Sequence, residues 1–322
     1  MKAILKVALA LLFFAALNVG LVHAWSNGGY STDSANPKYG THDWIAQHAL
    51  DWLPTQEKQY IANNLQAYLL GTELPDNDNA SLGGIGDTQK HHVYFSSDGQ
   101  VTDDASAQRA AAEYTTALNC LKTQDYVDAA KAAGAMSHYI DDMGVFGHVM
   151  GSSTPWGTET HHSDYEDYVN DRTNTYVASF DKYLLFDGSL STITAYKATV
   201  NLAYDTTFGG SSLLTCVWMD ENYNWSNPTF ADRCGQSLNL AVNAVADVLH
   251  TLYQEAGSPT TTPAASQTPN STTTQPTATT TPYPTVPMTT PELPVQTAIV
   301  LLFAASAAAG LAATVKRRKT TL

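Results

Sequence analysis

Apolar residues recur at helical spacing through most of the chain between positions 42 and 256. The segments with this period are 42–53, 56–70, 105–121, 126–143, 162–176, 190–206 and 233–256. Thr41 is the expected N-cap of the first segment, and Pro54 ends it. Residues 71–104 are rich in Gly, Asp and Asn and are expected to form a loop. No run of residues alternates between apolar and polar in the way a strand requires, so the predicted fold class is all-α.

The beginning of the chain has a different pattern. Residues 1–24 place Lys2 and Lys6 before an apolar core and close on the small residue Ala24. This arrangement is typical of a secretory signal peptide, and cleavage after Ala24 would make Trp25 the new N-terminus. An uncleaved membrane anchor is the alternative interpretation.

The other end predicts a stalk and a membrane anchor. Residues 258–292 are dominated by Thr, Pro and Ser, which favours an extended linker. Residues 293–315 are apolar and long enough to cross a bilayer, and residues 316–322 carry a basic cluster expected on the cytoplasmic side. A tail that is cut and exchanged for another anchor would give the same location. The folded domain is therefore expected over residues 25–257, exported and held at the cell surface.

Composition narrows the choice of partners. The formal net charge of −14 argues against binding nucleic acid through a basic patch, so no specific nucleic-acid partner is expected. Cys216 and Cys234 flank one loop and are predicted to form a disulfide, whereas Cys120 is expected to be a free, buried thiol. Three N-x-S/T sequons are compatible with surface exposure, at Asn79, Asn224 and Asn270.

The candidate chemistry is concentrated in residues 138–166. His138 precedes Asp142 by four positions, His162 precedes Glu166 by four, and His148 lies between the two pairs. Residues four apart on a helix share a face, and imidazole with carboxylate is a suitable ligand set for zinc. One such pair could be a salt-linked helix surface. Two pairs and a further histidine within one segment favour a metal site.

Residues outside this segment can complete such a site. Trp25 at a processed N-terminus would offer an α-amine and a carbonyl oxygen, and Asp76 offers a loop carboxylate. His42 and His48 share a predicted helix but are six residues apart, so they face different sides and at most one is expected in the site. His250, on the last predicted helix, is interpreted as a histidine packed at a helix interface.

With these residues included, the chain resembles the zinc-dependent phospholipase C family, to which the bacterial toxin phospholipases belong. Members of that family are all-helical and bind three zinc ions. Their ligands follow one order: an N-terminal Trp, a His opening the first helix, a loop Asp, a His before aromatic residues, H-x-x-x-D, a further His and H-x-x-x-E. The matching residues here are Trp25, His42, Asp76, His92, His138, Asp142, His148, His162 and Glu166.

Some positions of this match are open, and parts of the chain depart from the family. The open choices are His91 or His92, His161 or His162, and Asp76, Asp78 or Asp87. The arm before His42 and the loop between Asp76 and His92 are longer than usual. The C-terminal lipid-binding β-sandwich of the toxin members is replaced here by the predicted stalk and anchor.

The resemblance also implies how the ligands divide among three zinc ions. Asp142 would bridge two ions. The ligands that complete these two are Trp25 and His42 for one, and Asp76, His92 and His138 for the other. The third ion would take His148, His162 and Glu166.

The activity implied by the resemblance is hydrolysis of a phospholipid, by a metal-activated water, to diacylglycerol and a phosphorylated head group. Asp76 would be a catalytic residue that orients or deprotonates the water. Two alternatives remain. Single-strand-specific zinc nucleases share the fold, but they typically end in H-x-x-x-D, whereas this chain has His162 and Glu166. A non-catalytic surface protein could bind zinc only for stability.

Overall fold

The computed structural model describes residue 25 and residues 28–209 and 215–259. The predicted signal peptide at 1–24, the predicted stalk at 258–292 from residue 260 on, the predicted membrane span at 293–315 and the predicted basic tail at 316–322 lie outside these residues. Within the described part, no helix is both long and apolar enough to cross a membrane.

The described residues are mostly helical, as the spacing of apolar residues predicted. The α-helices are α2 (Thr41–Trp52), α3 (Thr55–Ala62), α4 (Leu65–Glu73), α5 (Ala105–Lys122), α6 (Tyr126–Asp141), α7 (His162–Asn170), α8 (Ala195–Phe208), α9 (Thr215–Glu221) and α10 (Pro228–Glu255). Four short 3-10 helices add single turns, at Thr88–Lys90, Asp142–Gly144, Phe146–Val149 and Asp181–Tyr183.

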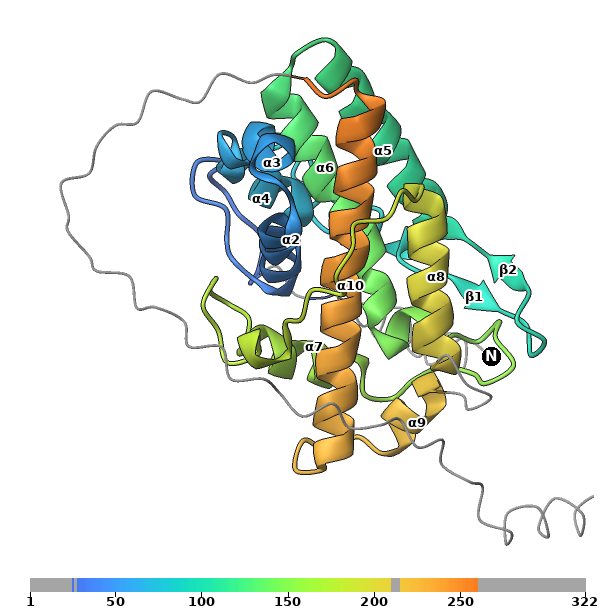
Figure 1. The fold of residues 1–322 in the computed structure, drawn as a ribbon. Helices are drawn as coiled ribbons and strands as arrows, with labels where there is room; N and C mark the ends of the chain where they lie inside the picture. The colour runs from blue at the N-terminus through green and yellow to red at the C-terminus, as the bar shows by residue number, and fades with distance from the viewer. Residues whose placement is uncertain (1–24, 26–27, 210–214, 260–322) are drawn as a thin grey trace, which may run out of the picture. The chain divides into compact units, whose positions relative to one another are not determined.

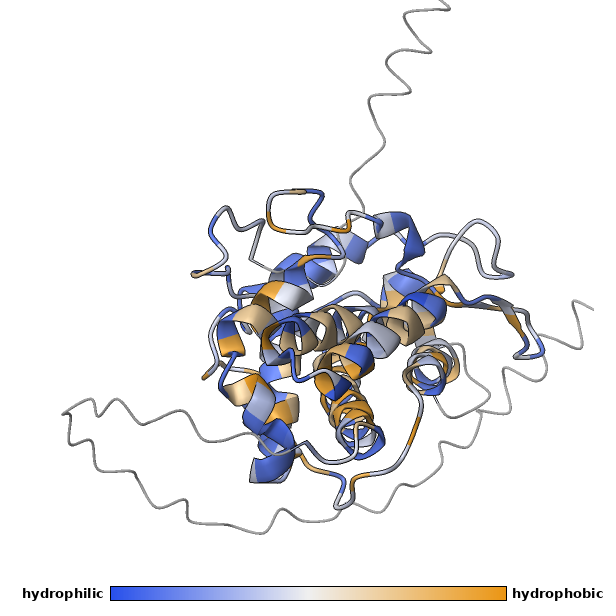
Figure 2. Cartoon of the chain, turned by 90° about the horizontal axis from the view of Figure 1, so that it is seen from above, coloured by the Kyte–Doolittle hydropathy of each residue, from blue (hydrophilic) through white to orange (hydrophobic). Residues whose placement is uncertain are grey.

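The helix α10 runs the length of the bundle, with α2 on one side and α8 on the other, and it crosses in front of α6 (Figure 1). The side chain of Asn227 caps its first turn by accepting from Thr229 N, and Pro228 occupies the first turn, where no backbone donor is required. The helices carry both apolar and polar residues (Figure 2), as expected of amphipathic helices around a shared core. Trp25 and Trp44 are fully buried in that core.

Helices α4 and α6 approach so closely that their backbones touch. A Cβ atom added to Gly71 would lie 2.1 Å from the Lys131 carbonyl oxygen, and one added to Gly134 would lie 2.0 Å from the Tyr68 carbonyl oxygen. Only glycine fits both positions without displacing backbone atoms. This contact brings Thr72, near the end of α4, beside His138 on α6.

The loop expected at 71–104 contains a feature that the sequence did not predict. Strands β1 (Tyr94–Phe95) and β2 (Val101–Asp103) pair antiparallel, with an irregularity in register next to Phe95. Neither strand is long enough for an alternating pattern to be recognised in the sequence.

Several helix boundaries also differ from the prediction. The segment predicted as one helix at 56–70 is two helices, α3 and α4, separated at Asn63 and Asn64. The side chain of Asn64 donates to the Tyr60 carbonyl oxygen and so competes with the helical pattern. Helix α7 ends at Asn170 rather than near 176, and α9 was not predicted.

The predicted disulfide between Cys216 and Cys234 is wrong for this structure. Both cysteines are buried and free, the first on α9 and the second on α10. Burial raises the pKa of each thiol to about 12, so both are held as neutral apolar side chains. Cys120 is free, as expected, but only half-buried.

Candidate metal centre

The C-terminal end of α6 supplies the first two residues of a buried polar cluster. His138 lies in its last turn, and Asp142 begins the 3-10 turn that follows. A second 3-10 turn, Phe146–Val149, turns the chain back and brings His148 to the same place. All three side chains are almost completely buried.

Asp142 lies at the middle of this cluster, and its two carboxylate oxygens face different histidines. Oδ1 is 3.5 Å from His42 Nε2 and 3.7 Å from His148 Nε2. Oδ2 is 3.1 Å from His91 Nδ1 and 3.3 Å from His138 Nε2. A carboxylate with histidines around each oxygen has the arrangement of a ligand shared by two metal ions.

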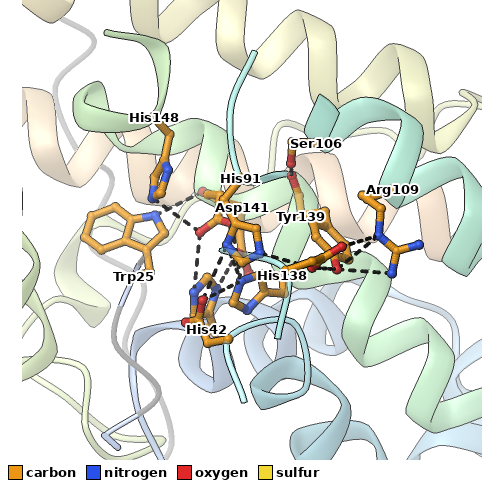
Figure 3. A network of polar contacts seen from close by, with 12 residues as sticks. Trp25, His42, His91, Ser106, Arg109, His138, Tyr139, Asp141 and His148 are labelled. Carbon is orange, nitrogen blue, oxygen red and sulfur yellow. Dashed lines mark hydrogen bonds and ion pairs between the residues drawn. The ribbon is translucent and has the colours of Figure 1, made fainter. Parts of the chain in front are cut away.

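Three groups of potential ligand atoms are found among the described residues, and the atoms of each group lie within 4.8 Å of one another. The groups are His42, His138 and Asp142; Asp76, His91 and His138; and His148, His162 and Glu166. Figure 3 shows His42, His91, His138 and His148 converging on one point beside Trp25. They come from three separate parts of the chain, at His42, at His91 and at 138–148.

The spacing of these atoms fits zinc. Ligand atoms around a tetrahedral zinc ion, each 2.0–2.1 Å from the metal, are about 3.3 Å from one another. The contacts of Asp142 with its four histidines, and that of His148 Nε2 with Glu166 Oε1 at 3.4 Å, scatter around this value.

The hydrogen bonding of the cluster also fits a cation. Within the described residues, His42 Nε2, His148 Nε2 and both oxygens of Asp142 are buried without a hydrogen-bond partner. Buried polar atoms normally have partners, and a metal ion would provide one for all of these atoms together.

A hydrogen bond at Nδ1 fixes the orientation of the His42 ring. His42 Nδ1 donates to Asp141 Oδ1 over 2.6 Å, which directs Nε2 toward Asp142. His138 Nδ1 donates in the same way to the Thr72 carbonyl oxygen over 2.6 Å, and the His42 and His138 rings stack at 3.8 Å. Partners of this kind set the tautomer of a ligating histidine.

The group of His148, His162 and Glu166 depends on close packing of the His162 ring against Gly147. His162 Nε2 is 2.9 Å from Glu166 Oε1, and Glu159 Oε1 lies 3.3 Å from His162 Nδ1. A Cβ atom added to Gly147 would lie 2.5 Å from His162 Cγ, so the ring needs the space that glycine leaves. His162 and Glu166, four residues apart on α7, thus face each other as predicted, and Glu159 contacts the other nitrogen of the His162 ring.

The structure brings His91, rather than His92, into the cluster. His91 is buried, and its Nδ1 lies 3.4 Å from Asp76 Oδ1 and near Asp142. His92 Nε2 pairs instead with Asp103 Oδ2 at 3.1 Å, and its ring stacks on Tyr94. Successive side chains of an extended segment point to opposite sides, so only one of these two histidines can face the site.

The other candidate residues differ in burial and in their distance from the cluster. His162 lies in the cluster, whereas His161 stacks on Tyr223 at the surface, with 37% of its side chain exposed. Asp76 lies in the cluster and Asp78 is exposed. Asp87 is outside the three groups but lies 3.6 Å from His91 Nε2.

Trp25 is anchored beside the cluster by its side chain. The indole Nε1 donates to the Asp141 carbonyl oxygen over 3.0 Å, and the ring packs 5.3 Å from that of Tyr165. Coordination through its α-amine and carbonyl oxygen depends on cleavage after Ala24, a residue outside the described part of the chain. That role remains a prediction.

The remaining histidines among the described residues, His48 and His250, lie outside the cluster. His48 Nδ1 pairs with Asp51 Oδ2 at 2.8 Å, and its Nε2 lies 2.9 Å from the Tyr176 carbonyl oxygen. His250 Nδ1 pairs with Glu57 Oε2 at 2.7 Å, across the contact between α10 and α3. Each has ordinary protein partners, as expected of structural histidines.

The electrostatics of the cluster favour cations at its centre. Burial raises the pKa of Asp142, but His138, His148 and His91 lower it more, so the carboxyl stays ionised. Burial lowers the pKa of His91, but Asp142 and other acceptors raise it to about 10. Glu166 and Glu159 likewise outweigh burial and raise the pKa of His162 to about 10, so metal binding has to displace protons from His91 and His162.

Sequence reasoning missed the residues that hold the ligands in place. Asp141, Thr72, Glu159 and Gly147 all contact cluster histidines, yet none was singled out. Glu159 precedes His162 by three residues, a spacing that could have drawn attention to it. Asp141 and Thr72 act on histidines 99 and 66 residues away, and no local pattern reveals such pairs.

Comparison with known proteins gives one family match. The sequence model described as "Zinc dependent phospholipase C" matches residues 41–247. None of the curated proteins compared with the chain matches it in sequence.

Solved structures similar to the chain include two clostridial toxins. The alpha toxin from Clostridium absonum is 17% identical, with a TM-score of 0.46 over 70% of this chain and 66% of the toxin. The alpha-toxin of Clostridium perfringens from avian strain SWCP is 15% identical, with a TM-score of 0.41 over 71% of this chain and 66% of the toxin. The chain thus spans 66% of the length of each toxin.

Proposed function

Since this chain belongs to the zinc-dependent phospholipase C family, we propose that its helical domain hydrolyses phospholipids between glycerol and phosphate. The products would be diacylglycerol and a phosphorylated head group. The observation that carries this proposal is the position of Asp142, whose two oxygens face separate sets of buried histidines.

We propose that the cluster holds three zinc ions. One would be bound by Trp25, His42 and Asp142, the second by Asp76, His91, His138 and Asp142, and the third by His148, His162 and Glu166. His91 replaces His92 in this assignment because it is the one that reaches the cluster. Bound zinc would supply Lewis acidity toward phosphate oxygens and a lowered pKa for water.

The protein's own contribution is to fix the ligands before the substrate arrives. Asp141 and the Thr72 carbonyl oxygen keep a proton on Nδ1 of His42 and His138, so that each Nε2 is directed inward. Asp142, Asp76 and Glu166 bring negative charge that would offset the cations. Rigid ligands of this kind lower the reorganisation needed during phosphodiester cleavage.

Asp76 is proposed to orient or deprotonate the attacking water. It lies in the loop after α4, with its side chain 7% exposed. His91 Nδ1 and His138 Nε2 lie 3.4 Å and 3.8 Å from its Oδ1, so its position is tied to two ligands. A carboxylate at that place can accept a proton while staying fixed in direction.

The test offers the purified protein two phosphodiesters. Phosphatidylcholine in mixed micelles and single-stranded DNA are each incubated with zinc-replete protein, with chelator-treated protein, and with treated protein to which zinc is returned. We expect chelator-sensitive release of phosphocholine that zinc restores.

The matched control is Glu166→Gln, which keeps the side-chain shape and removes the charge near His162. It should fold but release little phosphocholine. Cleavage of DNA alone would point to a zinc nuclease of the same fold. Zinc-replete protein that cleaves neither compound would indicate a non-catalytic zinc-binding protein.

We further propose that the domain acts outside the cell, held near lipid by the apolar segment at 293–315. The supporting observations are the signal-like pattern of residues 1–24 and the basic cluster at 316–322. Mass spectrometry of the mature protein should find Trp25 at its N-terminus, and protease added to intact cells should release the domain. A retained residue 24 would contradict the proposed role of Trp25.

A further inference from the structure

Asp87 connects the metal centre to a network outside it. Its Oδ1 lies 3.6 Å from His91 Nε2, the ring nitrogen that points away from Asp142. The same oxygen accepts a hydrogen bond from the Tyr139 hydroxyl over 2.5 Å. Its other oxygen, Oδ2, is 2.7 Å from Arg109 Nε.

Arg109 holds this carboxylate from helix α5. Its guanidinium donates to the Tyr139 hydroxyl over 3.2–3.3 Å and to Glu113 Oε1 over 2.9 Å, so it is fixed on three sides. Figure 3 shows Arg109 and Tyr139 at the far end of the network from His42 and Trp25. A partly buried arginine held in this way keeps a carboxylate in one orientation.

The backbone of Asp87 also supports a second residue of the same group. Its N–H donates to the Pro75 carbonyl oxygen over 3.0 Å, directly before Asp76, and Ile85 N donates to the Leu74 carbonyl oxygen over 2.8 Å. These bonds close residues 74–87 into a loop. Asp87 therefore contacts His91 through its side chain and stabilises the backbone next to Asp76.

The remaining ligand of the group is linked to the same network by sequence. His138 precedes Tyr139 on α6, and the hydroxyl of Tyr139 binds Asp87. The other two groups have different supports, namely Asp141 behind His42 and Glu159 behind His162. Asp87 is thus connected to all three members of the group Asp76, His91 and His138. Only His138 among them also belongs to a second group, and the histidines particular to the other two groups are supported by Asp141 and Glu159.

From this geometry we infer that Asp87 and Arg109 are positioning residues for one metal position, the one formed by Asp76, His91 and His138. They hold the loop at 74–91 and the His91 ring in the ligating arrangement, and they leave the other two positions unaffected. The inference depends on the proposed zinc centre but not on which phosphodiester it cleaves.

The experiment measures zinc directly. Full-length wild-type protein, Asp87→Asn and Arg109→Gln are equilibrated with a series of buffered free-zinc concentrations, and bound zinc per chain is measured by mass spectrometry of the metal. Residues behind a ligating histidine typically change metal affinity by about 10–100-fold. In both variants we expect the zinc affinity of one position to fall by that factor, so that this ion dissociates at a correspondingly higher free-zinc concentration than in wild type. The other positions should keep their wild-type zinc affinity.

Three further variants test how the effect reaches the metal position. Glu113→Gln changes a contact of Arg109 but none of Asp87. Its zinc affinity should stay within about twofold of wild type, a smaller change than that expected for a residue bonded to a ligand. Arg109→Lys keeps the charge without the planar contact and should fall between wild type and Arg109→Gln. A double variant of Asp87→Asn with His91→Ala should be no worse than His91→Ala alone, because both changes act on one interaction.

Zinc curves identical to wild type in Asp87→Asn and Arg109→Gln would overturn the inference. Equal weakening of all three positions would overturn it too, because the network would then support the fold in general. If Asp87→Asn fails to fold, the comparison of Arg109→Gln with Arg109→Lys still decides. Wild-type protein that binds three zinc ions but cleaves no phospholipid would defeat the proposed function and leave this inference standing.

Discussion

His42 and His48 lie on the same helix, α2, and both are buried, yet their surroundings differ. His42 has one nitrogen bound to Asp141 and the other, Nε2, directed at Asp142 without a hydrogen-bond partner among the described residues. His48 has both nitrogens satisfied, by Asp51 and by the Tyr176 carbonyl oxygen. Burial alone therefore does not distinguish a proposed ligand from a histidine with ordinary protein partners.

The difference lies in what surrounds the second nitrogen. Around His42 there is a further histidine ring stacked at 3.8 Å and a buried carboxylate, an arrangement that is unfavourable without a cation. Around His48 there are the Tyr176 ring, stacked at 4.5 Å, and the edge of Trp44, which are ordinary packing partners. His48 thereby connects α2 to the segment that follows α7.

The largest effect should separate these two histidines. His42→Ala removes a proposed zinc ligand. It should lower phospholipid hydrolysis by more than the roughly 100-fold expected for loss of a residue that hydrogen-bonds to a ligand. His48→Ala should stay within a few-fold of wild type. The measurement is hydrolysis at saturating zinc together with bound zinc per chain. Loss of zinc from His48→Ala, or full zinc content in His42→Ala, would break the distinction.

The same contrast can be applied to two adjacent residues. His91→Ala should lose one zinc ion, because His91 Nδ1 faces Asp76 and Asp142. His92→Ala should keep all of its zinc, because His92 pairs with Asp103 at the hairpin. Bound zinc in the two purified variants is compared at one free-zinc concentration. The reverse result would restore His92 as the ligand.

A smaller change in zinc affinity is expected when the carboxylates that contact the two α2 histidines, Asp141 and Asp51, are substituted. Asp141→Asn leaves the volume unchanged but weakens the hold on His42 Nδ1, and zinc affinity should fall by about 10–100-fold. Asp51→Asn alters the corresponding contact of His48 and should leave zinc affinity at the wild-type value. Titration with a competing chelator measures both. Equal affinities for Asp141→Asn and wild type would show that Asp141 plays no part in zinc binding.

The smallest effect concerns stability alone. His48→Ala removes the contacts with Asp51 and with the Tyr176 carbonyl oxygen, while the exposed Asp51 keeps its hydrogen bonds from the Tyr176 hydroxyl. The loss should lower the free energy of unfolding by about 0.5–1.5 kcal/mol. Urea unfolding should detect the same loss with zinc and with chelator, since His48 is not a ligand. A loss seen only in the presence of zinc would place His48 in the metal centre after all.

Much of this protein can be predicted from its sequence. The spacing of apolar residues predicts most helices, because an amphipathic helix records its buried face every three to four residues. The pairs His138 with Asp142 and His162 with Glu166 predict ligands for the same reason, since residues four apart share a face. The described structure brings both pairs into the cluster.

The tertiary structure decided what local spacing does not encode. Adjacent histidines such as His91 and His92 differ only in the direction of their side chains, which depends on the path of the loop at 74–91. Asp141 holds His42 across 99 residues, and the glycine contact between α4 and α6 sets Thr72 beside His138. The sequence by itself thus determined the helices and the chemical nature of the site. Which side chains meet there depends on contacts between distant segments, which exist only once the chain has packed.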